Sequence, residues 1–435
     1  MSFDCEVLIV GAGAAGLSAL RELDRAGCPA LCLEARQRIG GRIFTVDDPL
    51  SPLPVELGAE FIHGRPPEIW DIVNAAPLTA YDCGGRAIRL QGGRVQDEDA
   101  WAAIESVMAD MRLAARQGSD RSFSEFLANS VHTDEAKRWA AGYVEGFNAT
   151  RQEIVGIASL AQDADASDEI EGDRAFRLVS GYRSVPLHLL AGVAEPARKL
   201  RVNSVVESIV WQPAEVSVHV RHALTGSHKV IRSRSVIVTV PLGVLQAEAG
   251  IHFEPEPGDA LRAARRLAVG QVMRVVLRFQ EAFWEGNKSL ASVGCLLSQE
   301  PVFPTWWTPL SVRAPLLTGW SAGSHADPLL GQPQAQVICQ AVDALTRITQ
   351  ADPTRIADLL EAAYFHDWHA DPFSRGAYSY TPAHALAARA ALAEPVRETL
   401  YFAGEATELF GHSATVHGAI ATGKRAAQQI LARRR

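Results

Sequence analysis

Residues 5–16 read CEVLIVGAGAAG, and this stretch decides the fold. A short apolar run rich in β-branched residues predicts a buried strand, and the glycine-rich run after it predicts a tight turn. A helical stretch then ends at Gly27, and a second apolar run from Ala30 to Leu33 leads directly into Glu34. Strand, glycine turn, helix, strand and acid in this order are typical of a Rossmann unit that binds a dinucleotide.

Each glycine of the turn has a separate role in such a unit. Gly11 permits the tight turn, Gly13 lets backbone N–H groups approach a pyrophosphate, and Gly16 lets the helix pack closely on the strand. The helix begins near Ala14 and Ala15, so its positive N-terminal end faces the phosphates. We predict that these five residues bind the cofactor. A glycine turn that serves packing alone is the alternative.

The residues after the second strand discriminate between dinucleotides. Glu34 lies where a carboxylate can accept hydrogen bonds from a ribose 2′-OH, and an acid there disfavours the 2′-phosphate of NADP. Ala35 and Arg36 follow Glu34 directly. Further on, Gly41 lets the backbone approach a phosphate closely, and Arg42 can donate two hydrogen bonds to it. This continuation favours FAD over NAD.

The run EARQRIGGR at 34–42 resembles the flavin amine oxidase superfamily, which includes monoamine and polyamine oxidases, histone lysine demethylases, L-amino acid oxidases and protoporphyrinogen oxidase. The block FAGEATELFGHSATVHGAIATGKRAA at 402–427 is similar to the C-terminal signature of that family. The resemblance covers essentially the whole chain and implies an α/β fold of two domains. A Rossmann-type FAD domain would be built from discontinuous segments, and a substrate domain from a mixed sheet with helices. The implied segments are 1–75, 176–245 and 369–435 for the FAD domain and 76–175 and 246–368 for the substrate domain.

By the same resemblance, the C-terminal signature contributes residues to the cofactor site. Gly404 and Glu405 would lie at the ribityl chain or the nearby phosphates. Thr415 and Val416 would lie beside the flavin ring, and the N-terminus of the following helix would stabilise negative charge on reduced flavin. No cysteine occurs from 402 to 418, near where monoamine oxidases carry the one that binds flavin covalently, so we expect non-covalent FAD.

Smaller matches add further cofactor contacts. Gly58, Ala59 and Glu60 resemble the family's loop that passes the flavin, and Val206 matches the position whose backbone holds the adenine. Trp368 begins a segment that resembles the family's W…DP…RGSYSY pattern, which reaches the flavin ring. Each of these matches rests on one short stretch.

The resemblance also implies a reaction. A neutral amine approaches the flavin face and a hydride passes from the carbon next to nitrogen to flavin N5. The imine hydrolyses to an aldehyde, and O2 is reduced to H2O2. The substrate would be a small amine, with a polyamine among the candidates. The cofactor supplies the hard chemistry, and the protein supplies orientation, desolvation and electrostatics.

Several side chains are candidates for the substrate side. Tyr378 would form one aromatic wall, but the opposite position is Thr415, so we expect no full aromatic cage. Trp307 in PTWWTP either lines the pocket or is a core tryptophan. His63 in EFIHG falls where mammalian polyamine oxidases carry a histidine near the amine, and it either relays a proton or makes a structural hydrogen bond. Glu145 is a candidate for a second amine, although solvated glutamates are common on helices.

Arg274 departs from the family pattern. Many family oxidases carry a lysine at this position that holds a water at flavin N5, and arginine stays protonated and cannot act as a base. Arg274 could donate to a water or pair with a buried carboxylate. If the lysine speeds the reaction with O2, this chain is a slow oxidase or uses another acceptor.

Two other functions are consistent with the sequence. The first is another branch of the same fold, either an L-amino acid oxidase or an FAD-dependent desaturase of a large apolar substrate. An amino acid oxidase needs an arginine clamp on the substrate carboxylate, for which Arg274 is the candidate. The second is a non-catalytic FAD-binding interaction module, which the missing lysine and the incomplete cage suggest.

Composition sets further limits. The chain has 435 residues, 47% of them hydrophobic, which is enough for two cores, and its net charge of −8 argues against a nucleic acid partner. The first strand starts close to Met1 and no long apolar run occurs, so we expect no signal peptide, no membrane anchor and a cytoplasmic location. The cysteines are scattered without a CxxC pair, which indicates a reducing compartment, no disulfides and no metal site, with Cys5 and Cys28 in the core.

The remaining hydrophobic patterns give a coarse map of elements. We expect helices over 98–165 and a solvated loop over the acidic stretch at 162–173. We expect strands near 201–210, 216–220, 235–240, 272–279, 316–320 and 399–403, and a closing helix from about 415.

Overall fold

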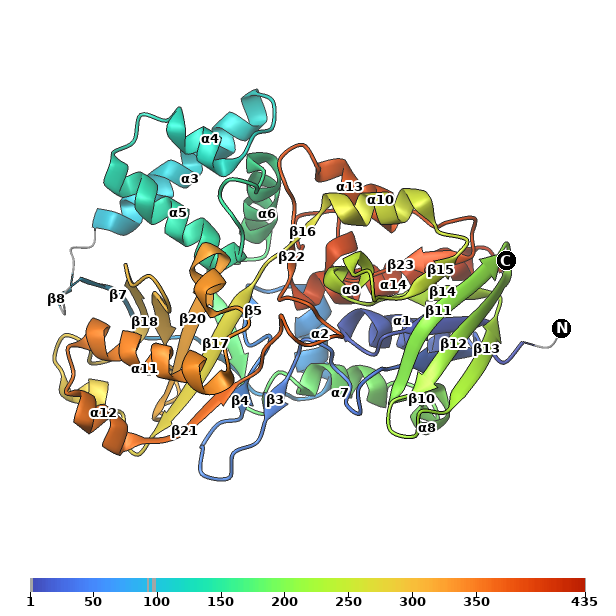
Figure 1. Ribbon diagram of the computed structural model, residues 1–435, viewed down its shortest axis with the longest axis horizontal. Coiled ribbons are helices and arrows are strands. Elements are labelled where there is room, and N and C mark those ends of the chain that lie inside the picture. Colours follow the sequence, from blue (N-terminus) through green and yellow to red (C-terminus); the bar gives the residue numbers. More distant parts are fainter. Residues whose placement is uncertain (1–2, 92–93, 96–98, 435) are drawn as a thin grey trace.

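Figure 1 shows the computed structural model, which describes residues 3–91, 94–95 and 99–434. A five-stranded parallel sheet lies in the right half of that view. In sheet order its strands are β10 (Leu200–Arg201), β2 (Ala30–Leu33), β1 (Val7–Val10), β14 (Ser235–Val238) and β23 (Leu400–Phe402). Every residue of β1, β2, β14 and β23 is buried, as expected for parallel strands covered on both faces. The predicted Rossmann-type sheet, built from segments far apart in the sequence, is confirmed.

Successive residues of β1 face two different cores. Val7 and Ile9 pack against helices on one face of the sheet, and Leu8 and Val10 pack against an antiparallel sheet and two helices on the other. The elements on the first face are α1 (Ala14–Arg25), α14 (Val416–Ala432), α2 (Pro67–Ala75) and α7 (Ser184–Ala191). Those on the second are β13 (His228–Ser233), β12 (Glu215–His222), β11 (Ser204–Gln212), β15 (His252–Glu254), α10 (Gly258–Arg266) and α13 (Leu386–Ala393).

A seven-stranded mixed sheet forms the other half of the molecule, on the left of Figure 1. In sheet order its strands are β21 (Leu360–Phe365), β17 (Val272–Phe279), β20 (Leu316–Ala322), β19 (Thr305–Trp307), β18 (Val293–Ser298), β7 (Arg86–Gln91) and β8 (Arg94–Val95). The helices α11 (Gln334–Thr349) and α12 (Pro353–Leu359) cover one face. Met273, Val275 and Leu277 of β17 point into the core beneath α11, so the alternation of the strand directs Arg274 to the opposite face.

A group of helices lies above the second sheet at the upper left of Figure 1, and they are α3 (Asp99–Gln117), α4 (Phe123–Ala128), α5 (Asp134–Asn148) and α6 (Ile157–Glu169). The expectation of a solvated loop over 162–173 is wrong, because α6 continues to Glu169. Arg112 and Arg116 on α3 pair with Asp165, and Arg112 also pairs with Asp168, so guanidinium groups offset the negative charge along this helix. No helix in the described ranges is both long and apolar enough to cross a lipid bilayer.

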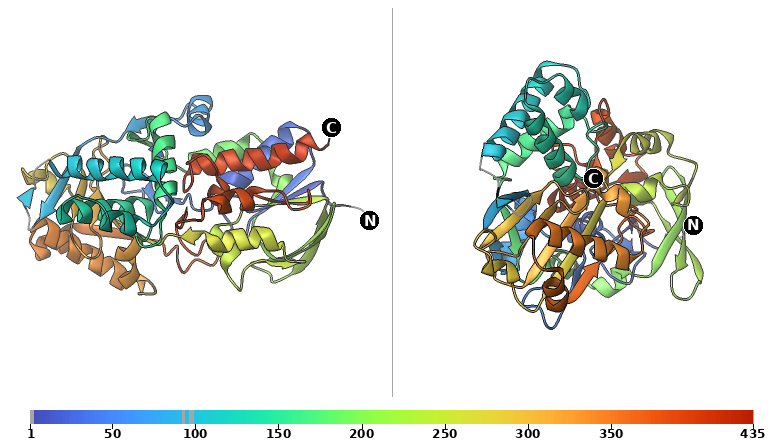
Figure 2. Two further views of the ribbon diagram at one scale, coloured as in Figure 1. Left: turned by 90° about the horizontal axis from the view of Figure 1, so that it is seen from above. Right: turned by 60° about the vertical axis from the view of Figure 1, so that its left-hand side comes forward.

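Short strands and loops join the two halves, which Figure 2 shows side by side. The joining strands are β3 (Thr45–Val46), β4 (Val55–Glu56), β5 (Ile62–His63), β6 (Ala80–Asp82), β9 (Ala175–Leu178), β16 (Ala268–Val269) and β22 (Ser379–Tyr380). The other short elements are α8 (Pro196–Lys199), α9 (Leu242–Gln246), η1 (Phe283–Gly286), η2 (Gly323–Leu329) and η3 (Glu405–Thr407). The α/β architecture agrees with the expected fold, while the domain boundaries at 75, 175, 245 and 368 stay predictions.

Candidate active site

A cavity of about 1660 Å³ lies where the two halves meet. Its volume exceeds the roughly 300–1,000 Å³ of an ordinary small-molecule pocket, so it has room for a dinucleotide and a second ligand together. Every residue that the sequence placed at the site lines this cavity except Gly16. On the cofactor side these are Gly11, Gly13, Ala14, Ala15, Glu34, Ala35, Arg36, Gly41, Arg42, Gly58, Ala59, Glu60, Val206, Trp368, Gly404, Glu405, Thr415 and Val416, and on the substrate side His63, Arg274, Trp307 and Tyr378.

The glycine turn has the geometry that its sequence predicts. Gly11 has φ +103°, and a Cβ there would lie 2.7 Å from Thr239 Oγ1. A Cβ on Gly16 would lie 1.9 Å from the Gly11 carbonyl oxygen, so Gly16 serves close packing of α1 on the turn. The N-terminus of α1 has no side-chain cap and no acidic residue in its first turn. Its free N–H groups therefore open towards the cavity and suit an anion.

Glu34 connects the turn with the end of β2. Its side chain is buried, with Oε2 accepting from Ala12 N at 2.8 Å and Oε1 from Arg36 N at 2.9 Å. Each carboxylate oxygen can accept a second hydrogen bond, so Glu34 keeps the capacity to bind ribose hydroxyls.

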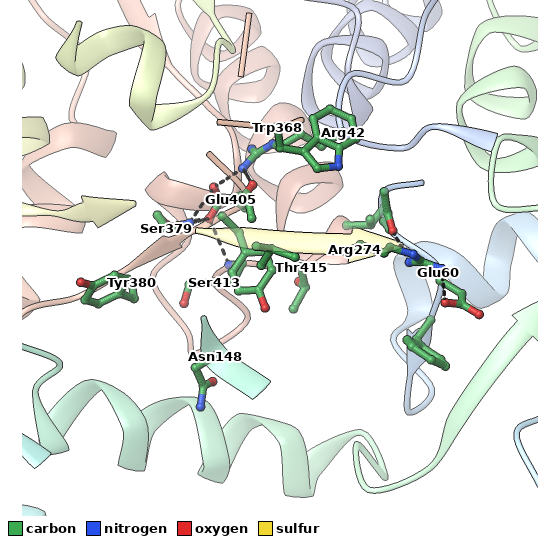
Figure 3. Close-up of a pocket in the computed structure, with 18 of the residues that line it drawn as sticks. Arg42, Glu60, Asn148, Arg274, Trp368, Ser379, Tyr380, Glu405, Ser413 and Thr415 are labelled. Carbon is green, nitrogen blue, oxygen red and sulfur yellow. Dashed lines mark hydrogen bonds and ion pairs between the residues drawn. The ribbon is translucent and has the colours of Figure 1, made fainter. Parts of the chain in front are cut away.

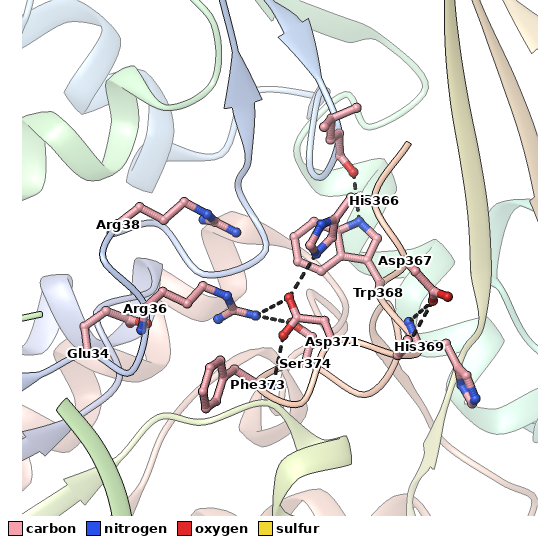
Figure 4. Close-up of polar contacts among 12 residues, drawn as sticks. Glu34, Arg36, Arg38, His366, Asp367, Trp368, His369, Asp371, Phe373 and Ser374 are labelled. Carbon is pink, nitrogen blue, oxygen red and sulfur yellow. Dashed lines mark hydrogen bonds and ion pairs between the residues drawn. The ribbon is translucent and has the colours of Figure 1, made fainter. Parts of the chain in front are cut away.

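Arg36 belongs to a polar cluster that sequence reasoning missed (Figure 4). Its Nη2 donates to Asp371 Oδ2 at 2.7 Å and to Ser374 Oγ at 3.0 Å, and His366 Nε2 lies 2.9 Å from the same Asp371 oxygen. Burial alone would raise the pKa of Asp371, but the hydrogen bonds from His366 and Arg36 lower it below its ordinary value. The Arg36–Asp371 pair thus ties the segment after β2 to the segment after Trp368.

Arg42 and Glu405 join the two ends of the chain at the cavity (Figure 3). Arg42 Nη1 donates to Glu405 Oε1 at 3.0 Å and to the Ala377 carbonyl at 2.6 Å. Ser379 Oγ donates to Glu405 Oε2 at 2.6 Å. Glu405 is therefore turned towards Arg42, and we expect it to act on a phosphate mainly by positioning that guanidinium.

Thr415 is the N-cap of α14. Its Oγ1 accepts from Gly418 N at 2.9 Å and donates to the His412 carbonyl at 2.7 Å. The hydroxyl is thus occupied by capping, and Thr415 and Val416 present the N-terminus of α14 to the cavity.

Arg274 pairs with a buried carboxylate, which is one of the two alternatives that the sequence left open. Its Nη2 donates to Glu60 Oε2 at 2.5 Å and its Nη1 to the Gly58 carbonyl at 2.8 Å. Arg177 Nε donates to the other oxygen of Glu60 at 2.6 Å, and Trp307 Nε1 donates to Oε2 at 3.0 Å. Burial would raise the pKa of Glu60, but the charges of Arg177 and Arg274 lower it, so the cluster holds one carboxylate between two cations.

Figure 3 places Arg274 and Glu60 together at one side of the pocket, away from the Arg42–Glu405–Ser379 group. Arg274 arrives from β17 and Glu60 from the loop after β4. Sequence reasoning missed Arg177, although a charged residue inside the apolar run AFRL of β9 was a signal of a buried partner.

Aromatic rings surround the substrate side of the cavity. Phe61 contacts Trp307 with ring centroids 5.6 Å apart, and Trp307 contacts Trp320 at 5.6 Å. His63 lies 5.8 Å from Phe61 and 5.6 Å from Phe147. All of these residues line the cavity, so Trp307 is a lining residue and not a core tryptophan.

His63 and Tyr378 complete this wall. Burial lowers the pKa of His63 to about 4, so its imidazole is neutral near pH 7. Among the described residues its ring nitrogens have no hydrogen-bond partner. Tyr378 Oη donates to the Phe147 carbonyl at 2.9 Å, which fixes the ring at the edge of the cavity.

Glu145 lies on α5 and lines the cavity. Its carboxylate accepts hydrogen bonds from Gln152 N at 3.2 Å and from Ser324 Oγ, and the side chain is buried. Each of its oxygens can accept a second hydrogen bond, so a role at a second amine stays a prediction.

Residues 14–431 match the family model for flavin containing amine oxidoreductases. The chain belongs to this family of flavin-dependent amine oxidoreductases. It is similar to Lysine-specific histone demethylase 1 homolog 2 of Oryza sativa subsp. japonica, with 28% identity over 98% of this chain and 57% of that protein. It is also similar to Polyamine oxidase 4 of the same organism, with 26% identity over 98% of this chain and 88% of that protein. The chain thus spans about half the length of the demethylase relative.

Cyclohexylamine oxidase from Brevibacterium oxydans IH-35A has the same fold. The structures match with a TM-score of 0.82 at 20% identity, covering 99% of each chain. At this level of identity the likeness establishes the fold of this amine oxidoreductase.

FAD fits the residues that this amine oxidoreductase presents. A Cβ on Gly41 would lie 3.4 Å from Gly13 Cα, so the two glycines leave a narrow, flat cradle between the turn and the 40–42 loop. The uncapped N-terminus of α1, the acceptor capacity of Glu34 and the Arg42 guanidinium supply what a pyrophosphate with an unmodified ribose needs.

Proposed function

We propose that this amine oxidoreductase oxidises a small amine to an imine, which hydrolyses to an aldehyde, with O2 as the electron acceptor that becomes H2O2. One observation carries the proposal: a single cavity joins a dinucleotide-type turn to a chamber lined by aromatic rings. Family membership supports the amine chemistry.

Bound FAD supplies the acceptor for a hydride from the carbon next to nitrogen. We assign the pyrophosphate to Gly11, Gly13, Ala14, Ala15 and Arg42, and the ribose to Glu34. The adenine would lie at Val206, and the ring near Gly58, Ala59, Trp368, Thr415 and Val416. No cysteine occurs in the segment from 402 to 418, which supports non-covalent attachment.

The chain's own residues prepare the amine for this step. The rings of Phe61, Trp307 and Phe147 exclude water and stabilise positive charge that develops on nitrogen. His63 is neutral near pH 7 and can accept a hydrogen bond from an amine N–H. The site therefore favours the unprotonated amine, from which hydride can leave.

The rival function of amino acid oxidation depended on Arg274 as a clamp for the substrate carboxylate. Both terminal nitrogens of Arg274 donate to protein oxygens, and Arg177 is also committed to Glu60. Glu60 already occupies both guanidinium groups, and we take this arrangement to favour an amine without a carboxylate.

The test is anaerobic mixing of the yellow protein with monoamines, diamines, spermine and L-amino acids while flavin absorbance is followed. Bleaching by an amine followed by recovery of colour and formation of H2O2 in air is the expected result. Bleaching by L-amino acids alone would replace the proposal with amino acid oxidation. Stable yellow colour with every compound would favour the desaturase or the non-catalytic module.

A further inference from the structure

We infer that Asp371 is a positioning residue, which holds Arg36 at the nucleotide end of the cavity so that the affinity of the chain for FAD depends on the Asp371 carboxylate. The inference rests on the proposed function, which places FAD in the cavity. It concerns a residue to which that proposal gives no role. Asp371 does not line the cavity, so it would act on the cofactor through Arg36.

Arg36 presents free hydrogen-bond donors to the cavity. Its side chain lines the cavity and is 14% exposed, and both of its side-chain hydrogen bonds come from Nη2. Within the described ranges, Nε and Nη1 have no hydrogen-bond partner. Glu34 accepts from the backbone N–H groups of Arg36 and Ala12, which places Arg36 next to the glycine turn. A guanidinium in this place suits the oxygens of a phosphate or a ribose.

Asp371 binds the other side of this guanidinium (Figure 4). Its Oδ2 accepts from Arg36 Nη2 at 2.7 Å and lies 2.9 Å from His366 Nε2. Its Oδ1 accepts from Phe373 N at 2.9 Å. Burial would raise the pKa of Asp371, but the hydrogen bonds from His366 and Arg36 lower it, so the carboxylate is charged near pH 7. The Asp371 side chain is 8% exposed, and solvent therefore screens the pair weakly.

Aromatic rings restrict the movement of this ion pair. The His366 ring lies 4.3 Å from the Trp368 ring and 5.3 Å from the Phe44 ring. The Arg36 guanidinium lies 5.3 Å from the centre of the Phe373 ring, within the range of a cation–π contact. Ring packing and hydrogen bonds together limit the orientations that are open to Arg36.

Arg42, which also lines the cavity, is held by a carboxylate in the same way. Glu405 pairs with Arg42, and its side chain is 5% exposed. The carboxylate follows its arginine by 335 positions in the first pair and by 363 in the second. A long side chain that the protein has already ordered loses less conformational entropy when a ligand binds. The C-terminal part of the chain thus prepares both arginines for the cofactor.

The test measures Kd for FAD with holoenzyme, from the fluorescence of flavin that is released on dilution. Asp371→Asn removes the charge, while its side-chain oxygen can still accept from Phe373 N. We expect Kd for FAD to rise roughly 2- to 12-fold, the cost of immobilising one long side chain. Asp371→Ser keeps the same local hydrogen bond and should give a rise in the same range, so it serves if the first variant does not fold.

The outcomes separate this inference from the proposed function. An unchanged or lower Kd would overturn the role of Asp371 and leave FAD binding, and with it the proposed function, intact. Wild-type protein that binds no FAD would overturn the proposed function itself.

A double-mutant cycle tests whether Asp371 acts through Arg36. Arg36→Gln should raise Kd for FAD, and Asp371→Asn should then add less than about twofold in that background. At saturating FAD, the visible spectrum of the bound flavin should be the same in Asp371→Asn and in wild type. Equal effects of Asp371→Asn in both backgrounds, or an altered spectrum, would contradict a role confined to positioning Arg36.

Asp48→Asn is the matched control. The Asp48 side chain is 6% exposed, pairs with Arg278 and accepts from Tyr364, and it does not line the cavity. Its substitution should leave Kd for FAD within about twofold of the wild-type value. A rise equal to that in Asp371→Asn would show that loss of any buried ion pair weakens FAD binding, which would overturn the specific role of Asp371.

Discussion

Arg274 donates through both terminal nitrogens, to Gly58 and to Glu60, at the position where many family oxidases carry lysine. Because guanidinium stays protonated, this arrangement holds a positive charge beside the cavity at every pH in the physiological range. Glu60 and Arg177 fix the group in place. The same contacts prevent it from acting as the mobile, titratable donor that a lysine provides.

We predict that Arg274→Lys raises the rate at which air reoxidises the reduced flavin. A lysine is too compact to reach both Gly58 and Glu60, so it can hold a water towards the cavity. We expect a rise of roughly tenfold, equivalent to about 1.4 kcal/mol, in stopped-flow reoxidation. Arg278→Lys, on the same strand but paired with Asp48 and Glu361 outside the cavity, is the control. An unchanged or lower rate in Arg274→Lys would show that the lysine position does not limit oxygen reactivity here.

His63 supplies a prediction about pH and stability. Burial lowers its pKa to about 4, below the ordinary value of about 6.5, so as the pH falls through this range the unfolded chain binds the proton first. Its contribution to stability is therefore present above pH 6.5 and is lost towards pH 4. Between pH 7.5 and pH 5, the free energy of unfolding should therefore fall by about 2 kcal/mol less in His63→Phe than in the wild type.

Denaturant unfolding at the two pH values measures this difference. His252→Phe is the control, because His252 is exposed on β15. Equal acid sensitivity in wild type and His63→Phe would show that the imidazole is not desolvated.

Site residues can be predicted from the sequence where the chemistry of the site requires one particular residue type. Sequence reasoning allows Arg274 to pair with a buried carboxylate, but it places Glu60 at the flavin and does not identify Arg177 as a second partner. The reason is that this partner comes from β9, more than a hundred positions from Glu60, so no local pattern connects them. The role of Glu145 was undecided for the same reason, since its partners lie on other elements.

At the scale of elements, the glycine turn before α1 is the part with the least room for an added side chain. We predict that Gly16→Ala yields protein without bound flavin, because a Cβ there would lie 1.9 Å from the Gly11 carbonyl and push α1 away from the turn. The ratio of flavin to protein absorbance after purification measures the effect. Gly286→Ala, where an added Cβ meets nothing within 4 Å, should remain yellow. A yellow Gly16→Ala protein would refute the close-packing role.

The expected strands are present, but β7, β18 and β21 of the seven-stranded sheet were not predicted, and the C-terminal part of one helix was wrongly expected to be a loop. The run VMRVVLRF is buried along its whole length and forms β17 over the expected residues. The acidic stretch after residue 162 has the composition of a loop, but Leu160 and Ala161 anchor α6 in the core and Arg112 offsets its charge. Contacts with residues distant in the sequence stabilise this part of α6, and the local sequence around it does not reveal them.

At the scale of the whole molecule, the cavity lies at the junction of the two halves and draws residues from both. We predict that FAD raises the stability of both cores together, because it binds the folded arrangement alone. Apoprotein mixed with FAD at about 100 times Kd should gain about 2.7 kcal/mol in unfolding free energy. Fluorescence and far-UV circular dichroism should report one coincident transition. If FAD leaves the midpoint of the transition unchanged in one of the two signals, the two halves unfold separately.

The order of the parallel sheet has a consequence for how the protein is made. Helix α1 ends at Arg25, while its packing partner α14 begins at Val416 and the edge strand β23 at Leu400. At roughly 5–20 residues per second, a ribosome needs on the order of 20 to 80 s to travel between them. For that time Leu17 and Leu20 lack the partner that α14 provides. Until α14 has been synthesised, the apolar side chains of α1 that it covers stay exposed on the nascent chain and favour aggregation.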